Sequence, residues 1–247
     1  MKGNAIVFEI IVGAFFVVFY IGGSRAMGRL RHLTFLAGAV LFSLAIETAA
    51  VLSGLDNFYW YATNSYFKHY PLGGYVIWLG VVPLSVILLW YMVAMTSYVG
   101  ALHILPSRSA WGRAALAGGI ATLFYLLIEP VAVANRWWVF NAKSFYLIDV
   151  PLFAVLGVFL SVFVFTLVFH WTVTEPRDNK SLKKLEDRTV KRFFKSKKLA
   201  KNLSFHQLRA VFFFRLAVAF IAYSAVMTAV IVALWAVANR GQIKPTW

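Results

Sequence analysis

The sequence predicts an all-α polytopic membrane protein with six transmembrane helices, and three observations lead to this fold class. Of the 247 residues, 61% are hydrophobic and only 13% are charged. The apolar residues stand in long runs and not in amphipathic stripes, which is typical of membrane-spanning helices. The charged residues gather mainly between these runs. We therefore expect a single membrane domain over residues 1–247.

Six apolar runs are each long enough to cross a bilayer core of about 30 Å at about 1.5 Å per helical residue. A soluble domain of this length could not hide so much apolar surface. The expected spans cover approximately residues 5–23, 33–54, 74–99, 114–134, 150–173 and 210–237.

The distribution of basic residues predicts how the chain is oriented. Seventeen of the 24 Lys and Arg residues lie in segments 24–32, 101–113 and 174–209, which the alternation of spans puts on one side. Because basic loops stay on the cytoplasmic side, we expect both termini outside, N-out and C-out. Topology thus explains the net charge of +15, which does not indicate a nucleic-acid partner.

The segment 174–209 is the longest polar stretch of the sequence. Leucines and phenylalanines are interspersed with lysines over residues 177–201, which resembles an amphipathic helix lying on anionic lipid headgroups. A solvated tether between the fifth and sixth spans is the alternative. On the first interpretation, anionic membrane lipids are partners of this basic cytoplasmic loop.

Five of the nine acidic residues fall toward the outer side of the membrane in this topology. Glu9, Glu47 and Glu129 lie inside spans, whereas Asp56 and Asp149 lie at span ends. An ionisable residue inside a span indicates a functional site by default, with snorkelling or ion pairing as the structural alternative. We take Glu47 and Glu129 as the preferred acid/base pair, with Asp149 and Glu9 as candidates for activating water or for tuning the pKa of the pair.

The surroundings of Glu47 are repeated around Glu129. Each glutamate follows an isoleucine, has a valine four residues later, and leads through an aromatic loop to Val-Pro-Leu, at 82–84 and 150–152. The match predicts that spans two and three recur in the same orientation as spans four and five. Binding sites often lie at the interface of such repeats.

The outer loops 55–72 and 135–149 are crowded with aromatic residues. Aromatic belts at membrane interfaces are one explanation. A substrate site that shields a cation is the other. The candidate substrate-binding residues are Tyr59, Tyr61, Trp78, Tyr125, Trp137 and Trp138.

These residue types suit one chemistry in particular. A carboxyl group removed from water favours its neutral form and can act as a general acid. Beside aromatic faces, it could protonate an alkene of a lipid-soluble isoprenoid to give a tertiary carbocation. Capture by water would be hydration, and ring closure would be cyclisation. Neither reaction needs a cofactor or a metal, and the absence of cysteine excludes thiolate metal sites.

Residues 40–160 carry a longer pattern: a membrane Glu, a Gly, an aromatic-Tyr loop and a Pro, then Glu-Pro-Val-Ala, a Trp-rich loop and Val-Pro-Leu. This pattern resembles the integral-membrane carotenoid biosynthesis family, which includes carotenoid 1,2-hydratases of bacteria and bisanhydrobacterioruberin hydratases of archaea. The resemblance implies a multi-pass cell-membrane enzyme that hydrates a terminal double bond of a linear carotenoid. It is carried by Glu47, Gly54, Tyr59, Tyr61, Pro83, Trp90, Glu129, Pro130, Val131, Ala132, Trp138, Tyr146, Pro151, Leu152 and Gly157.

The chain departs from the family pattern at three of its polar positions. The family usually has Asp at Glu129, often another acid at Tyr125, and Gly at Asp149. An Asn that usually follows the second Pro-Leu is also missing.

Other classes of protein remain open. A carotenoid cyclase, a small transporter or a non-catalytic membrane subunit could use the same carboxyl groups. The inner halves of spans two to five are largely apolar, which argues against a transporter because a transport path would need polar residues there. A haem or metal protein could use the histidines near the inner ends of the spans, although they show no HxxxH or HxxH spacing. These are His32, His103, His170 and His206.

Overall fold

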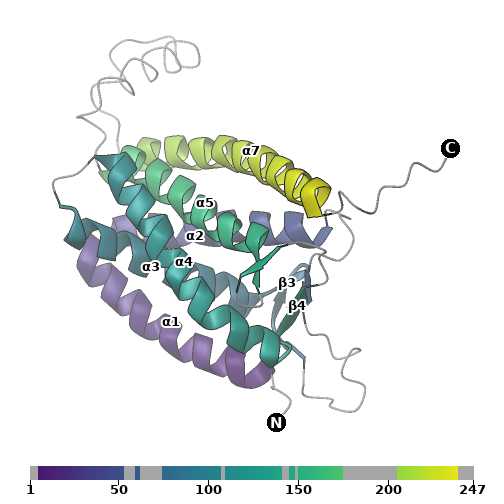
Figure 1. The fold of residues 1–247 in the computed structure, drawn as a ribbon. Coiled ribbons are helices and arrows are strands. Elements are labelled where there is room, and N and C mark those ends of the chain that lie inside the picture. Colours follow the sequence, from purple (N-terminus) through teal and green to yellow (C-terminus); the bar gives the residue numbers. More distant parts are fainter. Residues whose placement is uncertain are drawn as a thin grey trace.

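The computed structural model describes residues 5–52, 59–61, 74–106, 109–140, 145–147, 150–174 and 205–238. This part of the chain contains six helices that are long and apolar enough to cross a membrane, which confirms the predicted class (Figure 1). They are α1 (Ala5–Met27), α2 (Arg29–Leu52), α3 (Leu84–Ile104), α4 (Ala110–Ala134), α5 (Leu152–Phe169) with the π-helical turn η1 (His170–Thr174), and α7 (Phe205–Ala238).

Three pairs of short strands lie at the ends of these helices. The hairpins are β2 (Trp78–Leu79) with β3 (Val82–Pro83), and β5 (Tyr146–Leu147) with β6 (Val150–Pro151). The strand β1 (Tyr59–Tyr61), after α2, pairs antiparallel with β4 (Trp138–Phe140), after α4. The two aromatic loops are therefore joined by backbone hydrogen bonds at one end of the bundle, here called the strand end (Figure 1).

The helices differ in extent from the expected spans, most of all in the third. Residues 78–83, expected to be helical, form the β2–β3 hairpin, in which Gly80 has a φ of 64°. The helix α3 begins only after Pro83, whose ψ of 136° is extended, and it continues to Ile104. The same arrangement precedes α5, where Pro151 has a ψ of 133°. The fixed φ of proline and its missing N–H suit the start of a helix.

The central helices of the bundle are α3 and α5. In the most apolar 18 residues of each, 56% of the residues are buried, against 17% in α1 and 11% in α7. The helices α1 and α7 lie on opposite edges of the bundle (Figure 1). Their outward faces carry exposed side chains such as Ile10, Val18, Val218 and Ile221, as expected for contact with lipid.

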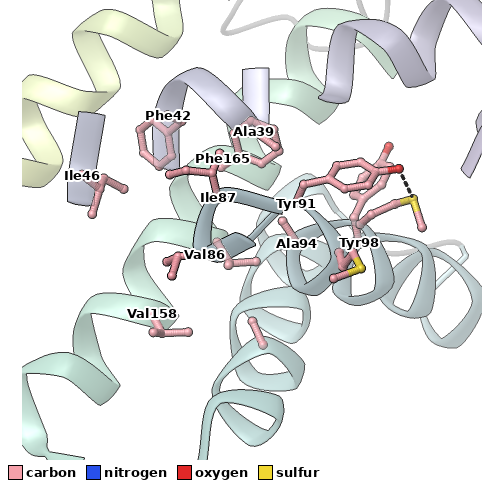
Figure 2. Packing of buried hydrophobic residues seen from close by; sticks show 14 of the residues in the cluster. Ala39, Phe42, Ile46, Val86, Ile87, Tyr91, Ala94, Tyr98, Val158 and Phe165 are labelled. Atoms are coloured by element: carbon pink, nitrogen blue, oxygen red, sulfur yellow. Dashed lines mark hydrogen bonds between the residues drawn. The ribbon is translucent and has the colours of Figure 1, made fainter. Parts of the chain in front are cut away.

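The core is built largely from aromatic rings. Phe35 of α2 packs edge-on against Phe165 and Phe169 of α5, with ring centroids 5.0 and 4.9 Å apart. The Tyr91 hydroxyl donates to Met95 Sδ at 3.2 Å (Figure 2). Toward the strand end this core continues into Ile46, Val86 and Val158, which also line a cavity (Figure 2).

Close packing of α4 on α5 depends on Gly118. A Cβ atom at this position would lie 2.9 Å from the Phe159 carbonyl oxygen, whereas one at Gly119 would meet nothing within 4 Å.

We expect Gly118→Ala to lower the free energy of unfolding by about 1–3 kcal/mol, because the backbone of α5 must move away. Gly119→Ala is the matched control and should not destabilise the protein, since alanine favours a helix. Thermal unfolding in detergent, followed by circular dichroism, measures both. Equal unfolding temperatures for the two variants would contradict the close approach.

Candidate active site

A cavity of about 220 Å³ lies toward the strand end, among α2, α3, α4, α5, α7 and the strand β4. Its walls are mostly aliphatic and aromatic. Two acidic side chains, Glu47 and Glu129, reach the same cavity from different helices. The indoles of Trp90 and Trp138 and the rings of Tyr125, Phe140 and Tyr223 also line it.

Glu129 is the more deeply buried of the two acids, with 1% of its surface exposed. Its Oε1 accepts a hydrogen bond from Trp138 Nε1 at 2.5 Å, and the Tyr125 hydroxyl, one turn earlier on α4, also interacts with the carboxyl group. Its Oε2 is buried without a hydrogen-bond partner among the described residues. A buried carboxyl group that lines a cavity is a candidate to exchange a proton with a bound ligand.

The turn that ends α4 brings Trp138 back over Glu129. The N–H of Trp137 donates to the Ala132 carbonyl oxygen, and that of Arg136 donates to Val133, both at 3.0 Å. These two bonds form a Schellman motif, in which Arg136 takes the left-handed position with a φ of 58°. The reversal places an indole N–H against a carboxyl group only nine residues away.

Glu47 is 6% exposed, and its Oε1 accepts a hydrogen bond from Trp90 Nε1 at 2.5 Å. The donor lies on α3 and the acceptor on α2, 43 residues apart. Glu47 and Glu129 are close enough to interact electrostatically. The described structure thus brings the two predicted glutamates into one cavity, each held by an indole N–H.

Glu9, a predicted candidate, does not line the cavity. Its carboxylate accepts hydrogen bonds from the backbone N–H groups of Val76 at 3.0 Å and Ile77 at 3.1 Å. These bonds attach the segment before β2 to α1. Burial raises the pKa of the neighbouring Tyr75 hydroxyl, and the charge of Glu9 adds to this effect, so Tyr75 stays neutral.

The predicted aromatic residues divide into three groups. Trp138 and Tyr125 line the cavity. Trp137 and Trp78 do not: Trp137 packs on Phe8, with ring centroids 4.4 Å apart, and Trp78 Nε1 donates to the Tyr75 carbonyl oxygen at 3.0 Å. The third group is Tyr59 and Tyr61, whose backbone forms β1 and whose side chains are outside the described part.

Three further predictions fall on segments that the structure does not describe. Asp149, Asp56 and nearly all of the basic loop, residues 175–204, lie outside the described residues.

The buried histidines near the other end of the bundle have hydrogen-bonding neighbours of their own. His32 Nδ1 lies 2.7 Å from Ser24 Oγ, and its Nε2 lies 2.5 Å from the Tyr91 hydroxyl. His170 Nε2 lies 2.9 Å from Arg113 Nη1. Within the described part of the chain, no three His, Asp or Glu residues are grouped so that they could hold a metal ion.

Several cavity residues were missed from the sequence. Trp90 carries a signal that could have found it, because an indole N–H inside a membrane span needs an acceptor. Gly157 of α5 was counted in the family pattern but not in the site. A Cβ there would lie 3.2 Å from Met227 Cε, so the missing side chain lets Met227 of α7 pack close to α5. The α7 residues Tyr223 and Met227 had no distinguishing signal in the sequence.

Comparison with known proteins adds one finding. The family described as carotenoid biosynthesis protein matches the chain over residues 5–239, a range that includes all six helices and every described cavity residue. No curated protein and no solved structure matches the chain. Because the match covers nearly the whole sequence, the chain belongs to the carotenoid biosynthesis protein family.

Proposed function

We propose that the protein is a cofactor-independent hydratase that adds water to a terminal isoprenoid double bond of a linear carotenoid. Membership of the family supports a role in carotenoid biosynthesis. The observation that carries the specific reaction is the pair of buried glutamates in one otherwise apolar, aromatic-walled cavity. Hydration by acid and base catalysis requires one group that donates a proton and another that accepts one, and two carboxyl groups with different surroundings can take these two roles.

Glu129 is the proton donor in this proposal. It is the less exposed of the two acids, and an ionised carboxylate in such a site is costly, so we expect it to carry a proton. The proton passes from its oxygen to the CH carbon of the terminal double bond. The neighbouring carbon, which bears two methyl groups, becomes a tertiary carbocation. The aromatic faces of the cavity stabilise that positive charge.

Glu47 completes the reaction as the base. A water molecule bonds to the cationic carbon through its oxygen and gives up one proton to the Glu47 carboxylate. Transfer of that proton back to Glu129, through solvent or between the two interacting carboxyl groups, restores the starting state. The net change is addition of one water across one double bond, with nothing oxidised or reduced. The indole N–H of Trp90 holds the Glu47 carboxyl group in position for this step.

We further propose that the two halves of the site are a parallel repeat, with the strand end on the outer side and both termini outside. The repeat is supported by the common order of elements: a glutamate helix, a paired strand, a hairpin ending in Val-Pro, and a second helix. The orientation is supported by the basic segments between helices at the opposite end of the bundle.

Expression in a lycopene-producing host tests the reaction. We expect the extracted pigment to be heavier by one water, or by two if both ends react, and the empty vector to leave the pigment unchanged. An isomeric product of unchanged mass would identify a cyclase instead. A panel of linear carotenoids that all remain unchanged, in cells whose membranes contain the folded protein, would refute the enzymatic proposal.

A further inference from the structure

The helices α2 and α7 pack closely toward the end of the bundle away from the strands. A Cβ atom at Gly38 of α2 would lie 2.6 Å from the ring of Phe212, so this ring of α7 packs directly on the α2 backbone. One turn further along α2, the ring of Phe42 contacts those of Phe220 and Tyr223, with centroids 6.3 and 6.1 Å apart. Aromatic side chains therefore close the α2–α7 interface on the side of the cavity that points away from the strand end.

Beyond these contacts, the cavity lies between the same two helices. Its α2 wall comprises Ile46 to Ala50, apart from residue 48, and its α7 wall begins at Tyr223 and reaches Ile231. Among the described lining residues only Ala49, on α2, and Thr228, on α7, are exposed. Elsewhere the lining residues are less accessible, and Val158 of α5 and Trp138 of β4 are buried. The cavity thus reaches the surface of the protein between α2 and α7.

The side chains at this opening are small and offer little to water. Thr228 Oγ1 donates to the Ser224 carbonyl oxygen at 2.8 Å, so its hydroxyl is already hydrogen-bonded within the helix. Nearby exposed side chains of α7, such as Val226 and Val232, are apolar. Both helices are long and apolar enough to span a membrane, so the apolar surface around the opening is suited to contact with lipid.

We propose that the gap between Ala49 and Thr228 is a lateral portal through which the hydrocarbon chain of a linear polyene extends into the bilayer while its end group occupies the cavity. This inference rests on the proposed function. A cavity of about 220 Å³ accommodates one end of a carotenoid and not its full length, so the remaining chain must leave through an opening. If the opening is apolar and faces lipid, that part of the polyene stays in the hydrocarbon core of the bilayer, in which it is already dissolved.

Bulky substitutions at the rim test the portal. Ala49→Trp and Thr228→Trp should each reduce, by about tenfold or more, the polyene that co-purifies with the protein, measured by its visible absorption. Ala229→Trp is the matched control, because Ala229 is exposed at the same depth on the face of α7 turned away from the cavity. It should bind polyene as the unmodified chain does. Polyene binding by the rim variants at the level of this control would overturn the portal.

A second measurement avoids the question of whether the rim variants fold. The chain has no cysteine, so Thr228→Cys can be labelled at one place in protein already purified and folded. We expect a bulky maleimide to release bound polyene and a small methylthio label to leave it bound. Equal retention with both labels would contradict the portal.

The same measurements separate this inference from the proposed reaction. Bound polyene that is lost on blocking the rim but never gains water would support the portal and refute hydration. A chain that binds no linear polyene in any form would refute both.

Discussion

Replacement of Glu129 by glutamine is expected to reduce the hydration rate by about 10²–10⁴-fold while the protein still folds. The amide has the shape of the carboxyl group, and its oxygen can still accept the hydrogen bond from Trp138 Nε1. It cannot deliver a proton to an alkene carbon. The water adduct should therefore disappear from the pigment extract, while the polyene that co-purifies with the variant stays at the unmodified level.

Glu9→Gln is the matched control for this substitution. It makes the same change of carboxyl to amide on another helix, but Glu9 contacts the N–H groups of Val76 and Ile77 outside the cavity. We expect it to retain product formation. If Glu129→Gln instead lowered the unfolding temperature and lost product only in proportion to lost protein, the glutamate would be a structural residue, as in a non-catalytic membrane subunit.

The meeting of Glu47 and Glu129 could be predicted because two independent patterns agreed. The apolar runs put both acids at a similar depth on helices of the same direction, and the surrounding residues are repeated. The indole partner of Glu47 could not be predicted in the same way. Trp90 lies 43 residues away, and whether it faces α2 depends on how α3 is rotated about its axis. Side-chain packing decides that rotation, and it leaves little trace in a helix that is apolar all round.

The contribution of α7 could not be predicted for the same reason. Tyr223 and Met227 stand among apolar residues with no strong periodicity, so the sequence does not show which face of the helix meets the cavity. The start of α3 is a different case. The residues before Pro83 are apolar enough to extend a span, and composition alone placed its start too early. Proline itself was the better signal, since it begins helices more readily than it continues them.

The Glu9 side chain shows that a similar depth in the membrane is not enough to predict that an acid joins the cavity. It was expected to join the other acids because α1 carries it to a similar level in the membrane. In the structure its carboxylate instead satisfies two backbone N–H groups of the segment before β2. Those N–H groups become available only because the segment forms no helix there, a feature that the apolar composition did not reveal. An acid inside a span can therefore be a backbone acceptor where an irregular segment packs against its helix.

Glu47→Gln is expected to separate protonation from water addition. Glu129 remains able to give its proton to the terminal alkene and to take one back, so the carbocation still forms reversibly. Without the Glu47 carboxylate, the attacking water lacks the base that the proposal assigns to it, and the carbocation returns its proton to Glu129 instead. We expect the water adduct to fall by about 10²–10³-fold, with little loss of bound polyene.

The experiment is run in D₂O with the recovered starting material analysed by mass spectrometry. Repeated protonation and deprotonation by Glu129 should place deuterium on the CH carbon of the terminal double bond in the Glu47→Gln variant. Glu129→Gln should give neither deuterium nor water adduct, and Glu47→Asp, which retains a carboxyl group, should recover part of the hydration. Recovered polyene free of deuterium in Glu47→Gln would show that Glu47 is required for protonation. Such a result would contradict the assignment of Glu129 as an acid that works without Glu47.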